Sequence, residues 1–277
     1  LLGAFDAALP FTLTEGQQQV GAEIFADLAK GHPMQRLLQG EVGSGKTLVA
    51  LRAMLAVVDA GGQAVLLAPT EVLANQHHAT ITAMLGDLGM GGQLGAHPDA
   101  TNVVLLTGAR NAVARREAQA QIADGTAGIV IGTHALLSDP VEFADLGLVV
   151  IDEQHRFGVE QRAALAAKAE RQPHTLVMTA TPIPRSVAMT VFGDLERSTL
   201  TEIPAGRADV TTFLVDWEKR AWITRMWERC AEEIARGGRV YVVCPRIDAH
   251  DDGGEDDGEP VQALLDEHGR PLAEKRP

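Results

Sequence analysis

The 277-residue sequence has few of the residues that mark several protein classes. It holds only two cysteines, Cys230 and Cys244, with no C-x-x-C pair and no cluster with histidine, so it indicates neither a disulfide framework nor a zinc site. No apolar run approaches the roughly 18 residues that a membrane helix needs, and the first residues lack the basic start of a signal peptide. We therefore expect a protein of the reducing cytoplasm with no membrane partner.

Basic residues are also scarce, and the net charge is −13 at pH 7. Such a balance argues against a nucleic-acid partner, because phosphates are contacted mainly by Lys and Arg. However, seven of the acidic residues lie in residues 248–259, a run without Lys or Arg that is typical of a solvated linker. This run lacks the D-x-[DN]-x-[DN]-G spacing of a calcium loop. The distribution of charge therefore weakens the objection to a nucleic-acid partner.

Hydrophobic residues make up 45% of the chain, which is ample for a buried core. Short apolar runs alternate with segments rich in Ala, Leu, Gln and Glu, and this alternation predicts an α/β fold with a mainly parallel sheet covered by helices on both faces. The expected strands are residues 36–39, 64–68, 103–107, 129–132, 148–152 and 175–179, and the expected helices are residues 47–58, 71–85, 112–123 and 160–169.

The pattern changes after residue 207. A strand at 212–215, a helix at 217–236 and a strand at 239–244 are expected before the acidic run. We predict a main domain at 1–207, a connector and the start of a second domain at 208–247, and a flexible acidic segment at 248–277. Because the sequence does not begin with Met, we expect it to be a piece of a longer polypeptide.

One motif indicates nucleotide binding. The run Gly40-Glu41-Val42-Gly43-Ser44-Gly45-Lys46-Thr47 fits G-x-x-x-x-G-K-[ST] and lies between an expected strand and an expected apolar helix. Its glycines let backbone N–H groups approach a polyphosphate, the lysine supplies a cation, and the Thr hydroxyl is a ligand for Mg²⁺. The alternative is a glycine-rich turn before a helix. The flanking strand and helix favour the phosphate-binding loop.

A second motif supplies carboxylates. Asp152 and Glu153 follow the apolar run 148–151, so they are expected at the tip of a strand. There Asp152 would hold Mg²⁺ and Glu153 would orient or deprotonate an attacking water. A solvated turn is the alternative and would be preferred if the pair stood alone. Together with the phosphate-binding loop, the pair predicts an NTP-hydrolysing site.

These motifs, with Asp152-Glu153-Gln154-His155 and Met178-Thr179-Ala180-Thr181, resemble the superfamily 2 helicases and translocases. Residues 68–77, 132–136, 152–162 and 178–185 resemble the bacterial RecG family of branch-migration helicases in particular. The transcription-repair coupling translocases share part of this wording but typically have Glu-Glu-His where this chain has Glu-Gln-His. The resemblance implies a RecA-like P-loop NTPase lobe, followed by the beginning of a second such lobe.

The resemblance also implies roles for individual residues. Lys46 and Thr47 would contact the β and γ phosphates and Mg²⁺. Asp152 would bind the metal, and Glu153 would act on the water. Gln154 and His155 would lie near the γ phosphate. The remaining implied residues serve DNA: Thr179, Ala180 and Thr181 would link nucleotide state to DNA grip, and Pro69, Thr70, Glu71, Thr133 and His134 would contact a DNA backbone. For Thr133 and His134, the residues alone favour an ordinary loop.

Gln17 has two interpretations. Thr14-Glu15-Gly16-Gln17 fits a capping box, in which Gln17 bonds back to the first residue of the motif. The family resemblance makes Gln17 a reader of adenine that selects ATP. We favour the adenine role, and the two roles are compatible.

Two hypotheses about function remain open. The first is the ATP-binding lobe of a DNA helicase that remodels replication forks and recombination junctions, with a second lobe of the same polypeptide and branched DNA as partners. The second is a nucleotide-binding interaction module without a catalytic cycle. Residues 205–277 contain no Gly-Arg-x-Gly-Arg run that could supply the family's catalytic arginines. We therefore expect the chain alone to bind Mg-ATP, to bind DNA only weakly, and not to unwind it.

Overall fold

The computed structural model describes residues 1–92, 96–108, 111–137, 141–152, 171–181, 195–202 and 211–244. The chain divides into two units, Leu1–Ala208 and Asp209–Pro277, and each is considered by itself. Unit 1 contains all the strands of the described residues and every residue of the predicted site.

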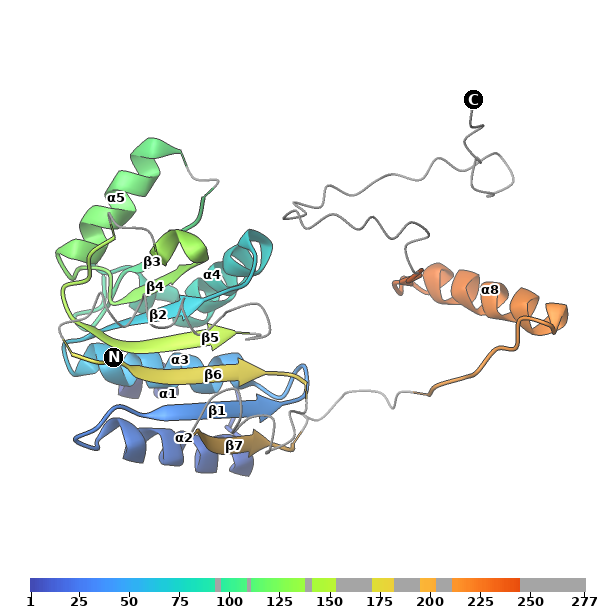
Figure 1. Ribbon diagram of the computed structural model, residues 1–277, viewed down its shortest axis with the longest axis horizontal. Coiled ribbons are helices and arrows are strands. Elements are labelled where there is room, and N and C mark those ends of the chain that lie inside the picture. The colour runs from blue at the N-terminus through green and yellow to red at the C-terminus, as the bar shows by residue number, and fades with distance from the viewer. Residues whose placement is uncertain are drawn as a thin grey trace, which may run out of the picture. The chain divides into compact units, whose positions relative to one another are not determined.

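In its described residues, unit 1 is built on a parallel sheet of seven strands in the order β3-β4-β2-β5-β6-β1-β7. In Figure 1 the labelled strands of its lower half run in the same direction. The strands are β1 (Gln35–Gly40), β2 (Gln63–Leu67), β3 (Val103–Leu106), β4 (Ile129–Gly132), β5 (Leu146–Asp152), β6 (His174–Thr179) and β7 (Glu196–Leu200). The α/β fold class is therefore confirmed.

Helices pack on both faces of this sheet. The described helices of unit 1 are α1 (Leu2–Ala8), α2 (Glu15–Leu28), α3 (Lys46–Asp59), α4 (Glu71–Leu85) and α5 (Ala112–Ala123), with short 3₁₀ turns η1 (Gly86–Gly89) and η2 (His134–Leu137). Side chains of α1 to α4 belong to one buried cluster, and side chains of α5 and η2 belong to another. Successive residues of the central strands alternate between the two clusters, as the period of two in a strand requires.

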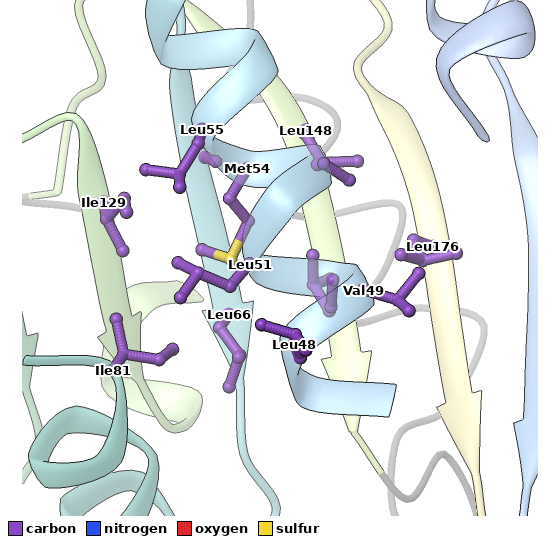
Figure 2. Close-up of a cluster of buried hydrophobic side chains, with 14 of the residues drawn as sticks. Leu48, Val49, Leu51, Met54, Leu55, Leu66, Ile81, Ile129, Leu148 and Leu176 are labelled. Atoms are coloured by element: carbon purple, nitrogen blue, oxygen red, sulfur yellow. The ribbon is translucent and has the colours of Figure 1, made fainter. Parts of the chain in front are cut away.

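The centre of the first cluster is α3, whose apolar side chains point toward β2, β5 and β6 (Figure 2). Leu51, Met54 and Leu55 are fully buried there, against Leu66 of β2 and Leu148 of β5. Burial of one such side chain stabilises the fold by about 1.5–3 kcal/mol. The helix that follows the phosphate-binding loop is thus anchored firmly in the core.

Buried charged side chains connect α2 to β1 and β7 near the amino-terminal ends of these two strands. The Arg36 guanidinium donates to Asp27 and Ser198 at 2.8 and 2.7 Å, and it also bonds Glu23 and Glu196. Arg36 and Asp27 have only 6% and 5% of their surface exposed. Because each buried charge has partners, the network avoids the cost of an unpaired ion.

Most expected elements of unit 1 are present. The helices expected at 71–85 and 112–123 and the strand expected at 129–132 match α4, α5 and β4 in both bounds. The other expected elements that lie in the described residues of unit 1 agree within two residues, whereas α1 was not predicted. The edge strand β7 was not predicted. The helix expected at 160–169 lies outside the described residues.

The expectation for residues 211–244 was partly wrong. A helix is present, α8 (Arg220–Ala235), but residues 212–215 and 239–244 are not strands. A strand requires a neighbour for its backbone N–H and C=O groups, and no pairing is found for either segment among the described residues. The apolar character of these segments was therefore not sufficient to predict their conformation.

Candidate functional site

The predicted motifs lie at one edge of the sheet, because they follow the carboxyl ends of neighbouring parallel strands. Gly40 ends β1, Thr179 ends β6 and Asp152 ends β5. In the register of the sheet Gln39 pairs with Thr179, and Asp152 pairs with Met178. The segments after β2 and β4 extend the same edge. This is where open parallel sheets bind their ligands.

The glycines of the phosphate-binding loop are required by its backbone. Gly43 and Gly45 have φ angles of 88° and 87°, a region that favours glycine. Gly40 is required for space, since a Cβ atom there would lie 2.6 Å from Ser44 Oγ. The Ser44 N–H donates to the Glu41 carbonyl at 3.1 Å and closes the turn, while Val42 is exposed. These residues form the compact loop that the motif predicts.

The polar groups of this loop fit a polyphosphate. Lys46 is the first residue of α3, and its ammonium donates to the carbonyl oxygens of Gly40 and Glu41 at 2.7 and 3.0 Å. It is thus held across the loop beside the helix N-terminus, where an anion is favoured. Ser44 Oγ is buried and has no hydrogen-bond partner among the residues that the structure describes. Thr47, the expected Mg²⁺ ligand, is the second residue of α3 and is partly exposed.

Gln17 bridges the start of α2 and the phosphate-binding loop. The capping box is present, because Thr14 Oγ1 accepts from the Gln17 N–H at 3.2 Å and Gln17 Oε1 accepts from the Thr14 N–H at 3.1 Å. Its Nε2 also donates to the Ser44 carbonyl at 3.0 Å. These side-chain bonds use one of two donor hydrogens and one of two acceptor positions of the amide. The adenine role stays a prediction, and the contact with the loop was not predicted.

The segment after β7 reinforces the start of α2. The Glu202 carboxylate accepts from the Gly16 N–H at 3.1 Å, and a negative charge is stabilising at a helix N-terminus. Its hydrogen bond with the Thr14 side chain and the one from Gly16 hold the pKa of Glu202 below its usual value. The start of α2, with Thr14, Gly16 and Gln17, is therefore held both by its own capping box and by Glu202.

Asp152 has a partner that was missed in the sequence. Its Oδ2 lies 2.7 Å from Nε2 of His77, which stands on α4. The side chains are 14% and 13% exposed, respectively. His77 lies within residues 68–77, a segment that already carried the RecG resemblance, but nothing in its spacing pointed to Asp152. The carboxylate keeps Oδ1 outside this contact.

The segment after β6 forms its own hydrogen-bonded turn. Thr179 is fully buried, and its Oγ1 lies 3.0 Å from Thr181 Oγ1 and accepts from the Thr181 N–H at 3.1 Å. Ala180 connects the two residues and is partly exposed. The hydroxyls that were predicted to link nucleotide and DNA therefore contact one another.

The predicted DNA contacts lie after β2 and β4. Thr70 caps α4, its Oγ1 accepting from the Leu73 N–H at 3.3 Å, and its neighbours Pro69 and Glu71 are partly exposed. Thr133 is only 8% exposed, whereas His134 is exposed at the start of η2. The arrangement leaves His134 as the more accessible side chain of this pair.

Three predicted residues, Glu153, Gln154 and His155, lie outside the described residues. Among the residues that the structure does describe, no group of three His, Cys, Asp or Glu side chains could hold a metal ion. Mg²⁺ bound with a nucleotide needs fewer protein ligands, since phosphates and water complete its shell. Thr47 and Asp152 are ligands of the right kind.

None of the helices in the described residues is long and apolar enough to cross a membrane.

Solved structures show the same fold. A structure described as RecG bound to a three-way DNA junction is 38% identical, with a TM-score of 0.72 over 88% of this chain and 31% of that one. The yeast DEAD-box splicing factor Prp28 is 17% identical with a TM-score of 0.54, over 75% of this chain and 49% of that one, which supports the fold alone. The RecA-like architecture of superfamily 2 helicases is thus confirmed for unit 1.

Sequence comparison leads to the family. An ATP-dependent DNA helicase RecG of Mycobacterium tuberculosis is 58% identical over 247 residues, covering 88% of this chain and 34% of that protein. The RecG of Synechocystis is 45% identical over 97% of this chain and 30% of that protein. The chain spans about a third of the length of these relatives, and the expected RecG resemblance is confirmed. The model of the DEAD/DEAH box helicases matches residues 14–190, and the chain belongs to this family.

Proposed function

We propose that the chain is the ATP-binding motor lobe of a RecG-type DNA helicase, which uses ATP hydrolysis to remodel branched DNA in repair and recombination. The observation that carries this proposal is the convergence of the phosphate-binding loop, Asp152 and the Thr179–Thr181 turn at one sheet edge. The 58% identity to a RecG helicase favours DNA as the polymer on which the motor acts. Such work also implies a cytoplasmic location.

The chain's own residues would divide the work as follows. Lys46 would leave the carbonyls of Gly40 and Glu41 and bind the phosphates, together with backbone N–H groups of the loop. Thr47 and Asp152 would hold Mg²⁺, which neutralises phosphate charge when bound. Glu153 would orient the attacking water, a role that the family resemblance assigns to it.

DNA would bind along the same edge. The loops at Pro69–Glu71 and Thr133–His134 follow β2 and β4, the strands on the side of β5 away from the phosphate-binding loop. The Thr179–Thr181 turn follows β6, the strand between β5, which ends at Asp152, and β1, which leads into the phosphate-binding loop. This order supports a route from nucleotide to DNA through adjacent loops. A second helicase lobe of the same polypeptide would supply the catalytic arginines.

The experiment is the ATPase rate of the complete protein with and without DNA. We expect a three-way junction to raise the rate more than a linear duplex of equal length does. Equal stimulation would reject RecG-type specificity and leave a general translocase, such as the transcription-repair coupling type. An absence of any ATPase would instead favour the nucleotide-binding module without a catalytic cycle.

A further inference from the structure

The contact between His77 and Asp152 joins two elements that are far apart in the sequence. His77 is on α4, which follows β2, and β2 pairs with β5, the strand that ends at Asp152. The two side-chain atoms, Nε2 and Oδ2, are 2.7 Å apart, a full hydrogen bond. A carboxylate that binds a cation can only accept a hydrogen bond, so in this role Nε2 of His77 is the donor.

The hydrogen bond compensates His77 and Asp152 for the loss of solvent around them. Both side chains are largely enclosed, at 13% and 14% exposed, so an unpaired nitrogen or carboxylate there would lose its solvation without compensation. The contact uses Oδ2 and leaves Oδ1 for another ligand. Hydrogen bonds of this kind, made to a metal-binding side chain from behind, orient the ligand and raise metal affinity.

We propose that His77 is a positioning residue that fixes the Asp152 carboxylate for the divalent cation of the bound nucleotide. The inference rests on the proposed function, in which Asp152 is a cation ligand. A carboxylate that is already held loses less rotational freedom when the cation arrives, and the site is thereby organised in advance. His77 itself touches neither nucleotide nor cation in this proposal.

The test is the affinity of the complete protein for Mn²⁺ in the presence of a saturating, non-hydrolysable ATP analogue, measured by electron paramagnetic resonance of the free ion. Replacement of His77 by Ala removes the donor, and we expect the dissociation constant for Mn²⁺ to rise about 10- to 100-fold. The affinity for the nucleotide without metal should stay within about twofold, because Lys46 and the loop are untouched.

Two further variants make the test specific. His77→Gln keeps an N–H donor near the position of Nε2 and should restore most of the Mn²⁺ affinity. Thr80→Ala changes an exposed side chain on the same helix and should leave it unchanged. An affinity of His77→Ala within twofold of the wild type, or no rescue by Gln, would overturn the inference. Wild-type protein that binds the nucleotide without any response to Mn²⁺ would overturn the proposed function, and this inference with it.

Discussion

Gly45 meets two requirements of the site, one of local backbone conformation and one of tertiary packing. Its φ of +87° is a backbone conformation that residues with a side chain rarely adopt. In addition, a Cβ atom at Gly45 would lie 2.3 Å from Nε2 of Gln17, the atom that holds the Ser44 carbonyl. The motif predicts the first requirement from sequence alone. The second depends on where α2 lies and could not be predicted.

The substitution Gly45→Ala should therefore lower the free energy of unfolding by more than backbone strain alone would. We expect a loss in free energy of unfolding of about 2–3 kcal/mol, with the bond from Gln17 to the loop broken and nucleotide affinity reduced. The matched control is Gly61→Ala, since Gly61 has a φ of +88° but no atom of the described residues within 4 Å of its Cβ position. It should cost about 1–2 kcal/mol and leave nucleotide affinity unchanged. Urea unfolding and nucleotide titration measure both, and equal behaviour of the two variants would contradict the close contact.

His77 and Gln17 mark the limit of prediction at the residue scale. Lys46, Thr47 and Asp152 could be proposed from the sequence because they lie in contiguous motifs whose chemistry is local. The partner of Asp152 stands on another element, 75 residues away. No spacing in the sequence encodes such a contact, because it depends on how α4 packs over β3 and β4 and so brings His77 to the end of β5.

At the scale of elements, prediction succeeded where local signals and burial agree. α4 and α5 begin after Thr70 and Asn111, whose side chains cap them, and both helices matched the expected bounds. β7 was missed because its sequence, Glu-Arg-Ser-Thr-Leu, is mostly polar and its position comes from pairing with β1. The strands expected at 212–215 and 239–244 were wrong for the converse reason. These segments are apolar, but in the described residues they pair with no strand.

The charge network between α2 and β1 gives a prediction at this scale. Burial alone would raise the pKa of Asp27, but the hydrogen bonds from Lys30 and Arg36 outweigh it and hold the pKa below 3.8. Asp27→Asn leaves Arg36 with Glu23, Ser198 and Glu196 as partners. We therefore expect the free energy of unfolding to fall by about 2 kcal/mol at pH 7, less than for a buried ion that loses all its partners. Thermal or urea unfolding measures this loss.

The effect of Asp27→Asn on the free energy of unfolding should depend on pH, and the pKa of Asp27 gives the direction. A carboxyl group with a lowered folded-state pKa adds stability above its ordinary value of 3.8, and that stability is lost as pH falls through the lowered value. The difference between wild type and Asp27→Asn should therefore be full at pH 7 and shrink below about pH 4. The exposed Asp87 serves as control, and Asp87→Asn should change little at any pH. A difference that grows toward low pH would contradict the role of Asp27.

At the scale of the whole molecule, the parallel sheet explains why separate motifs form one site. Parallel strands place their carboxyl ends at one edge, so the clustering of Gly40, Asp152 and Thr179 could be predicted from an α/β pattern. The order β5-β6-β1, which sets Thr179 between Asp152 and the phosphate-binding loop, could not. Strand order depends on the crossover connections, which local sequence does not specify.

The central claim is that the loop from Gly40 to Thr47 binds ATP through Lys46, and one substitution tests it most directly. Lys46→Ala removes the cation but none of the backbone turn, whose hydrogen bond joins Ser44 and Glu41. Charge-assisted contacts contribute about 1.5–3 kcal/mol each, so ATP affinity should fall about tenfold or more and the ATPase of the complete protein should be abolished. Calorimetric titration with Mg-ATP beside an ATPase assay is the measurement. Equal ATP affinity and equal ATPase in mutant and wild type would contradict the account.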